Sequence, residues 1–322
     1  MEEYILSFSD VIGHEDIKNH IINSIENGRF AHAYIISGED GLGKSILVKE
    51  IALKLLDKRI NRVYADIIEF KIKKENRSIK VDDIREINKE VNKKPYEEDK
   101  KVIIIYNSDL MTKEAQNAFL KTIEEPPENV FILMICESLD SILETIKSRC
   151  QIYKLNHLSE EDMKKFINKN YPNIDEELKE IFLKISDGIP GKVEKFIKDE
   201  DFKNMRNMSM NILKKMLLYK TNDMQSILEC TEFLVKHIYL LEEILTCFLS
   251  YIRDILVYKE TLNKKLILNI DKLEDLEVIS ESLSFKDLYN IINIIEDTKN
   301  KLSSNVNTAL VFNSMLLKMQ EV

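Results

Sequence analysis

Cysteine is scarce in this chain, and its four cysteines are scattered. Cys136, Cys150, Cys230 and Cys247 form no CxxC pair. The sequence therefore carries neither a disulfide framework nor a zinc-binding pattern. We predict reduced thiols, as in a cytoplasmic protein, and no zinc.

Long apolar runs and a secretion signal are also missing. The most apolar stretch, YLLEEILTCFLSYI, is interrupted by Glu242 and Glu243, whereas a transmembrane helix needs about 18 apolar residues in a row. The N-terminal residues MEEYILSFSD lack the basic-then-apolar order of a signal peptide. These absences predict a cytoplasmic protein without a membrane partner.

The chain has no excess of positive charge. Its formal net charge is -9, with 44% hydrophobic and 32% charged residues, a composition typical of folded globular proteins. Binding DNA along its backbone requires a positive field. We therefore expect any contact with nucleic acid to be made mainly through partner proteins.

Glycine and proline are absent from residues 192–322, because all seven glycines and all five prolines lie at or before Gly191. Without these breakers, and with apolar residues three and four positions apart, this part is predicted to be almost wholly helical. Residues 227–260 form one long helical candidate. Its wide apolar stripe is typical of packing against other helices rather than of a cofactor site.

The first half of the chain alternates between strand and helix patterns. Short apolar runs alternate with helical patterns, which predicts a parallel sheet covered on both faces. The fold class is thus an α/β domain, followed by a small helical domain and an all-α C-terminal domain, with boundaries at 1–156, 157–202 and 203–322. The strand candidates are residues 31–38, 65–72, 100–107 and 129–136, and the helix candidates are residues 44–56, 81–94 and 113–125.

A phosphate-binding pattern, GEDGLGKS, follows the first of these strands and opens a helix. Glycines at 38, 41 and 43 let the backbone N–H groups point at phosphate oxygens, and the helix N-terminus adds partial positive charge. Lys44 is expected to reach the β- and γ-phosphates of ATP or ADP, and the Ser45 hydroxyl to ligate Mg²⁺. Gly38, Gly41 and Gly43 complete the predicted nucleotide site.

The acidic residue that a P-loop ATPase places after a neighbouring strand is missing. Tyr106 and Asn107 stand there in VIIIYNSDLM, and neither carries a full negative charge at neutral pH. Asp109 comes two to three residues later, where we expect it to cap the next helix. Three interpretations stay open: nucleotide binding without efficient hydrolysis, hydrolysis rescued by Asp109 or another carboxylate, and loss of nucleotide binding.

Four stretches resemble the delta-prime family of bacterial DNA polymerase III clamp-loader subunits, within the AAA+ superfamily. These are FSDVIGHEDI, RFAHAYIISGEDGLGKS, LMTKEAQNAFLKTIEEPPENVFIL and SRCQIY. The resemblance extends from Phe8 to about Lys198. It continues more loosely through SYIRDILVYKE and NVNTALVFNSMLLKM, which are similar to the family's helical collar domain.

The resemblance implies a ring segment of related subunits that opens a sliding clamp and loads it at primer–template DNA. Expected partners are the gamma/tau and delta subunits and the clamp. Arg149 of SRC matches the arginine finger, which acts on the ATP of the adjacent subunit; its alternative is an ion pair with a local carboxylate. Lys192 matches the sensor-2 position or is an exposed lysine at a helix start. Val11 and Ile12 match the segment that packs against adenine, or are core residues.

Departures from the family pattern guide the choice of subunit type. Tyr106 and Asn107 replace the metal-binding acidic pair, which favours a delta-prime subunit that hydrolyses ATP poorly over a gamma/tau-type motor. The usual four-cysteine zinc module is absent, and only the link DKRINRVY follows the P-loop helix. The sensor-1 residue should fall within 136–138. A purely structural subunit without nucleotide remains the third possibility.

Overall fold

The computed structural model describes residues 4–5, 8, 10–72, 78–219, 224–302 and 306–322. Ser9 and Asn305, from stretches that carry the resemblance, lie outside these residues. The chain forms two compact units, one made of 1–172 and 188–191 and the other of 173–187 and 192–322. The division between the units thus falls inside the segment 157–202, and the three-domain division stays a prediction.

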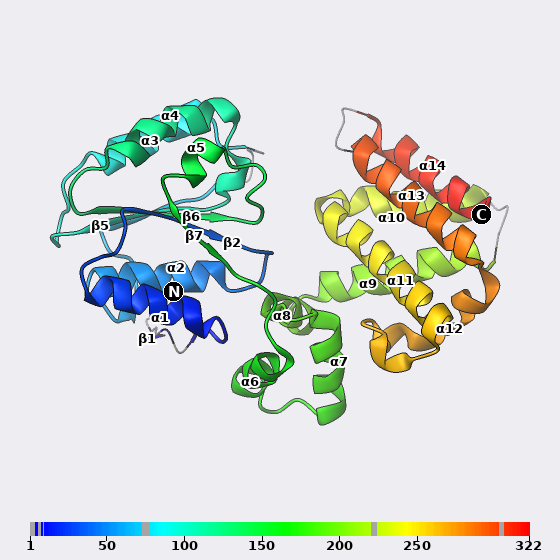
Figure 1. Cartoon of the computed structure of the whole chain (residues 1–322). Coiled ribbons are helices and arrows are strands. Elements are labelled where there is room, and N and C mark those ends of the chain that lie inside the picture. The colour runs from blue at the N-terminus through cyan, green and yellow to red at the C-terminus, as the bar shows by residue number, and fades with distance from the viewer. Residues whose placement is uncertain (1–3, 6–7, 9, 73–77, 220–223, 303–305) are drawn as a thin grey trace. The chain divides into compact units, whose positions relative to one another are not determined.

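A five-stranded parallel sheet forms the centre of the first unit (Figure 1), as the strand patterns predicted. Its strand order is β4-β5-β6-β2-β7. The strands are β2 (Ala33–Ser37), β4 (Ile67–Phe70), β5 (Lys101–Ile105), β6 (Val130–Cys136) and β7 (Gln151–Lys154).

Helices cover both faces of this sheet (Figure 1). Strand residues such as Ile36 and Ile104 pack with α1 and α2 in one core, and their neighbours Ile35 and Ile105 pack with α3, α4 and α5 in another. Burial on both faces explains why the central strands are continuously apolar. The helices of this unit are α1 (Glu15–Glu26), α2 (Lys44–Leu55), α3 (Val81–Val91), the 3-10 turn η1 (Ser108–Leu110), α4 (Lys113–Glu124), α5 (Glu144–Lys147) and α6 (Glu160–Asn170).

The strand order determines which loops meet. Strand β6 lies between β5 and β2, and all three are parallel. The segments after these strands therefore share one edge of the sheet, where α/β proteins bind their ligands. These segments are the P-loop after β2, residues 106–111 after β5, and residues 137–143 after β6.

A second, two-stranded sheet was not predicted from the sequence. It pairs β1 (Tyr4–Ile5) with β3 (Ile60–Asn61) in antiparallel register, so the short link after the P-loop helix contains a strand. Two residues are too few to produce a readable alternation of apolar and polar side chains.

The second unit is helical in its described residues, as the absence of glycine and proline indicated. One core runs through α9 to α14, and its fully buried members include Phe248, Tyr251 and Phe312. The elements are α7 (Glu176–Ser186), α8 (Pro190–Lys198), α9 (Glu200–Leu217), α10 (Met224–Lys236), η2 (Ile238–Leu240), α11 (Leu241–Thr261), η3 (Lys264–Leu266), η4 (Ile270–Lys272), α12 (Leu273–Ser282), α13 (Phe285–Leu302) and α14 (Thr308–Gln320).

The prediction of one long helix over residues 227–260 was wrong. The chain leaves the helical conformation at His237 (φ -104°, ψ 28°) and forms the turn η2 between α10 and α11. Helix α10 packs against α14, whereas α11 packs against α9, α12 and α13. A straight helix could not serve both sets of partners, so tertiary packing overrides local propensity here.

Candidate nucleotide-binding site

The P-loop connects the end of β2 to the start of α2, as predicted. Gly38, Gly41 and Gly43 have φ angles of 148°, 88° and 88°, a region that L-residues with a side chain rarely adopt. A Cβ atom at Gly38 would also lie 2.7 Å from the carbonyl oxygen of Leu155. Glycine is thus required by the backbone path of the loop.

Lys44 lies inside this loop. Its side-chain ammonium donates to the carbonyl oxygen of Gly38 and, at 2.7 Å, to that of Glu39. Only 7% of Lys44 is exposed, and burial lowers its pKa. The positive charge is therefore held at the position where the sequence pattern places phosphate groups.

The other end of the loop is open. A Cβ at Gly43 would meet no atom within 4 Å, and Ser45 is exposed. Gly43 is the N-cap of α2 and provides no side-chain cap for the first N–H groups of that helix. An uncapped helix start is a favourable place for an anion.

The crest of the loop is covered by the start of α8. The N–H group of Gly191 donates to the carbonyl oxygen of Gly41 at 3.0 Å. A Cβ added to Gly191 would lie 2.5 Å from the Cα of Gly41, and a Cβ at Gly41 would meet Ile189 at 3.0 Å. Two glycines about 150 residues apart in sequence thus let two backbones touch.

Val11 and Ile12, the predicted adenine-binding residues, lie in different surroundings. Val11 is 4% exposed and belongs to the same core as Leu42 and Ile189. Ile12 lines a groove of about 660 Å³ between α1 and α6. The buried Lys18 donates to the carbonyl oxygen of Val11 at 2.6 Å and fixes this segment. Core packing of Val11 is thus present, and contact with adenine stays a prediction.

Tyr106 occupies the position after β5 where an acidic residue would hold the metal. Its hydroxyl donates to a carboxylate oxygen of Glu69 at 3.0 Å, and Lys71 lies 4.6 Å from the centre of its ring. Burial and the Glu69 carboxylate raise the pKa of Tyr106 well above its usual value. The side chain therefore stays neutral, and its hydroxyl is hydrogen-bonded to Glu69 of β4.

The prediction that Asp109 caps the next helix was wrong. Thr112 is the N-cap of α4, and its hydroxyl accepts from the N–H of Ala115 at 3.2 Å. Asp109 lies one turn earlier, in η1, because Asn107 adopts a left-handed conformation (φ 52°) that redirects the chain. One Asp109 oxygen accepts from the N–H of Glu137 at 3.2 Å, and the other is buried without a hydrogen-bond partner in the part of the chain that the structure describes.

Glu137 is a further residue near the P-loop that the sequence did not single out. It directly follows β6, and its negative charge, like that of Asp109, acts to raise the pKa of Lys44 against the effect of burial. Cys136, one residue earlier, is a buried thiol whose pKa is raised by burial to about 12. Within the segment 136–138, Glu137 is therefore the residue that places charge near the lysine; the expected end of β6 was its only signal.

Arg149 follows α5, and its side chain is 40% exposed. Its Nε lies 2.8 Å from a carboxylate oxygen of Glu124, at the end of α4, and its Nη1 donates to the carbonyl oxygen of Thr145 at 2.9 Å. The local ion pair that was one alternative for Arg149 is present. The role as an arginine finger stays a prediction.

Two family models match the chain. One, described as DNA polymerase III, delta subunit, matches residues 13–159, and the other, described as DNA polymerase III, delta subunit, C terminal, matches residues 201–321. Together they span most of both compact units. The chain belongs to the clamp-loader family of DNA polymerase III subunits.

Several clamp-loader subunits are similar in sequence. DNA polymerase III subunit gamma of Buchnera aphidicola subsp. Schizaphis graminum is 32% identical over 202 residues, covering 56% of this chain and 55% of that protein. DNA polymerase III subunit delta' of Haemophilus influenzae is 31% identical over 160 residues, covering 45% of this chain and 49% of that protein. This chain spans about half or less of the length of the relatives it matches, and the identities do not separate the subunit types.

A solved structure supports the fold of this clamp-loader subunit. A RuvB variant from Thermotoga maritima aligns with a TM-score of 0.51 at 17% identity, covering 97% of this chain and 89% of that one. The predicted fold, an α/β domain followed by a helical region, is therefore confirmed.

Lys192 belongs to the second compact unit of the clamp-loader subunit, whereas the P-loop belongs to the first. Its side chain is half-buried on α8. The residue of α8 that meets the P-loop is Gly191. The sensor-2 role of Lys192 stays a prediction.

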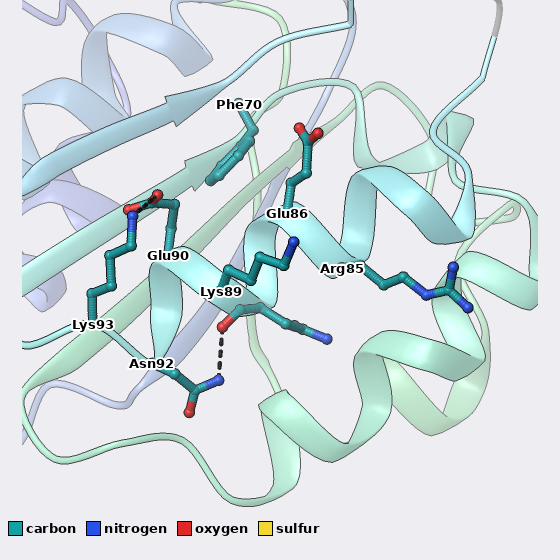
Figure 2. A pocket seen from close by; sticks show the side chains of 8 residues that line it. Phe70, Arg85, Glu86, Lys89, Glu90, Asn92 and Lys93 are labelled. Atoms are coloured by element: carbon teal, nitrogen blue, oxygen red, sulfur yellow. Dashed lines mark hydrogen bonds and ion pairs between the residues drawn. The ribbon is translucent and has the colours of Figure 1, made fainter.

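A separate groove of about 850 Å³ lies over the outer side of α3 (Figure 2), on the sheet face opposite to α2. The Phe70 ring contributes to it beside the ion pair of Glu90 with Lys93. The residues that line this groove lie outside the P-loop, and their charges have both signs. The groove is therefore separate from the P-loop and differs from it in chemistry.

No helix among the described residues is long and apolar enough to cross a membrane. In the same part of the chain, no three His, Cys, Asp or Glu side chains are grouped so that they could hold a metal ion. The magnesium site at Ser45 stays a prediction.

Proposed function

We propose that this chain is a delta-prime-type subunit of the DNA polymerase III clamp loader. It binds ATP or ADP, hydrolyses it poorly, and donates Arg149 to the nucleotide of a neighbouring subunit. Its partners are the gamma/tau and delta subunits and the sliding clamp, and it reaches primer–template DNA through the complex in the cytoplasm.

The proposal rests on Tyr106, which is neutral and hydrogen-bonded to Glu69. A phosphoryl-transfer site holds Mg²⁺ with an acidic residue at the end of this strand. Here a neutral tyrosine fills the position, and its hydroxyl is bonded to Glu69. A weak hold on the metal is the expected consequence, and with it slow hydrolysis.

The P-loop supports retained nucleotide binding. Lys44 would pair with the β- and γ-phosphates, and the backbone around Gly41 and Gly43 would supply N–H donors. Mg²⁺, bound with the nucleotide through Ser45, would neutralise phosphate charge. The exposed Ser45 and the open side of Gly43 leave room for both.

An ATPase assay tests the proposal at two levels. The isolated chain should show little turnover, and Lys44→Ala should reduce nucleotide binding without changing that turnover. In the reconstituted complex, Arg149→Ala should lower ATPase activity and leave nucleotide affinity of this chain unchanged. Turnover by the isolated chain that Lys44→Ala abolishes would instead identify a motor subunit.

The motor alternative has one observation in its favour. Asp109 lies in η1 after β5, Glu137 directly follows β6, and both act on Lys44 electrostatically. They supply the negative charge that Tyr106 and Asn107 do not. If they hold the metal, Asp109→Asn should abolish the turnover of the isolated chain.

The structural alternative, a subunit without nucleotide, is favoured by the contact between Gly41 and Gly191 at the crest of the loop. Equilibrium dialysis with labelled ATP and ADP separates it from our proposal. Binding only at millimolar concentration would leave the P-loop as a structural turn.

A further inference from the structure

Arg149 is held by its own subunit on two sides. Glu124 contacts Nε at 2.8 Å, and the Thr145 carbonyl and the Ser148 hydroxyl accept from Nη1 at 2.9 and 3.2 Å. In the described part of the chain, Nη2 has no such contact. Because the guanidinium group is planar, fixing two of its nitrogens fixes the direction of the third.

Helix α4, which carries Glu124 at its end, is held firmly in place. Helix α4 is capped by Thr112 at its start, and Phe119 and Ile123 anchor it with no exposed surface. Glu124 therefore projects from the last turn of a helix whose inner face is fully packed.

The segment that carries Arg149 is hydrogen-bonded to the same helix, α4. The buried Gln116 of α4 donates to the carbonyl oxygen of Ser141 at 2.8 Å and accepts from the N–H of Leu143 at 2.8 Å. These bonds hold the segment that leads into α5, and Ile146 of α5 is fully buried. Glu124 and Arg149 thus stand on two elements of fixed relative position.

Such a pair contributes little to folding. Glu124 is 44% exposed and Arg149 is 40% exposed, and ion pairs this exposed contribute little to stability. The ion pair matters more for the orientation of Arg149. A flexible arginine loses rotamer freedom when it contacts another molecule, whereas an arginine already held in one orientation loses less.

We propose that Glu124 is a positioning residue for Arg149: it fixes the guanidinium so that Nη2 faces outward to the phosphates of a nucleotide bound by the adjacent subunit. This rests on the proposed function of Arg149. Glu124 itself touches no nucleotide. Its removal leaves Arg149 charged and present but no longer oriented.

The complete clamp loader, reconstituted with variants of this chain, tests the proposal through its clamp- and DNA-stimulated ATPase activity. Glu124→Ala should lower kcat by about tenfold with KM unchanged, in keeping with the rate loss that follows misplacement of a transition-state group. Glu124→Gln, which keeps an oxygen acceptor for Nε, should recover part of that loss. The double variant Glu124→Ala/Arg149→Ala should be no slower than Arg149→Ala alone, since both changes remove one function.

Glu125→Ala is the matched control, because it removes the adjacent exposed carboxylate at the end of the same helix; it should leave kcat unchanged. If Glu124→Ala is as fast as the unmodified complex, or faster, while Arg149→Ala is slow, the positioning role is wrong and the finger role stands. If Arg149→Ala has no effect, both are wrong. The NMR signal of the Arg149 Nε–H group in the isolated chain should shift in Glu124→Ala but not in Glu125→Ala.

Discussion

At the scale of single residues, Tyr106 contacts Glu69 on the edge strand β4, and Glu69 also pairs with Lys49 of the P-loop helix α2. The Tyr106 hydroxyl contacts Glu69, as do Lys49 at 3.5 Å and Lys71 at 2.8 Å. Tyr106→Phe removes only the hydroxyl. We expect a loss of about 1.5–3 kcal/mol in the free energy of unfolding, as for one hydrogen bond to a charged group, measured by urea denaturation.

Tyr96→Phe serves as the control for this prediction, because Tyr96 is 86% exposed. It should leave the urea midpoint unchanged. If both variants unfold like the parent chain, the bond between Tyr106 and Glu69 makes no net contribution to stability.

Glu50 is a second residue with unusual surroundings. It lies on α2 with 4% exposure, and one of its carboxylate oxygens is buried without a hydrogen-bond partner among the described residues. Burial, with a smaller effect from the charge of Asp10, raises the pKa of Glu50 from 4.5 to about 7. A buried carboxyl without a partner favours its neutral form.

This raised pKa predicts a loss of stability as the pH increases. The native carboxyl binds its proton more tightly than the unfolded one, so the unfolded state ionises first, and stability falls between about pH 4.5 and pH 7. Above pH 7 the full penalty applies, on the order of 3 kcal/mol. Glu50→Gln should therefore stabilise the chain more at pH 8 than at pH 5, as measured by urea denaturation at both values.

An exposed carboxylate gives the comparison. Glu86→Gln on α3 removes the same charge from the surface, and its effect on stability should be nearly equal at the two pH values. A Glu50→Gln effect equally independent of pH would mean that Glu50 ionises normally in the folded chain.

The candidate site could be predicted from the sequence only where its residues are close together in the chain. The P-loop is eight consecutive residues, so its glycines, Lys44 and Ser45 were readable. Glu137 and Gly191 reach the loop through sheet order and the start of a later helix, and the only local signal for either was the expected end of β6. Asp109 was assigned to the wrong role because Thr112, three residues on, competes for the same cap.

At the scale of secondary-structure elements, the start of α8 is attached to the P-loop by backbone contact. Gly191→Ala would place a Cβ 2.5 Å from the Cα of Gly41, and neither backbone can rotate away as a side chain would. We expect a loss of about 1–3 kcal/mol in stability, as for other overpacked sites. Faster hydrogen exchange at residues 41–43 should accompany it.

Glu194→Ala, an exposed change on the same helix, controls for general effects on α8. It should leave exchange in the P-loop unchanged. Normal exchange at residues 41–43 in Gly191→Ala would show that the loop keeps its conformation without this contact.

Most of the elements themselves could be predicted, because strands buried on both faces and amphipathic helices leave clear periods in the sequence. Strand β6 (Val130–Cys136) and helix α3 (Val81–Val91) lie within the predicted ranges. The turn at His237 could not be predicted, since it contains neither glycine nor proline and results from the different partners of α10 and α11.

At the scale of the whole molecule, the two compact units have separate hydrophobic cores. Phe119 is fully buried in the first unit, and Phe248 in the second. Replacing either with Ala should cost about 3–5 kcal/mol in its own unit. In Phe248→Ala, hydrogen exchange should therefore rise around α9–α14 but not in the sheet. In Phe119→Ala, it should rise in the sheet but not around α9–α14.

The residues on the opposite side of the division serve as the internal control for each variant. A simultaneous rise of exchange in both units would mean that the chain unfolds as one cooperative body.

The covering of the P-loop by Gly191 has a consequence for dissecting this chain. The polypeptide passes between the units after Pro172, after Asp187 and after Gly191, so no single cut separates them. A fragment truncated at Pro172 retains every strand of the sheet yet lacks the turn that seats the crest of the loop. A fragment made in that way would present Gly41 uncovered, so the conformation of its P-loop would not be that of the intact chain.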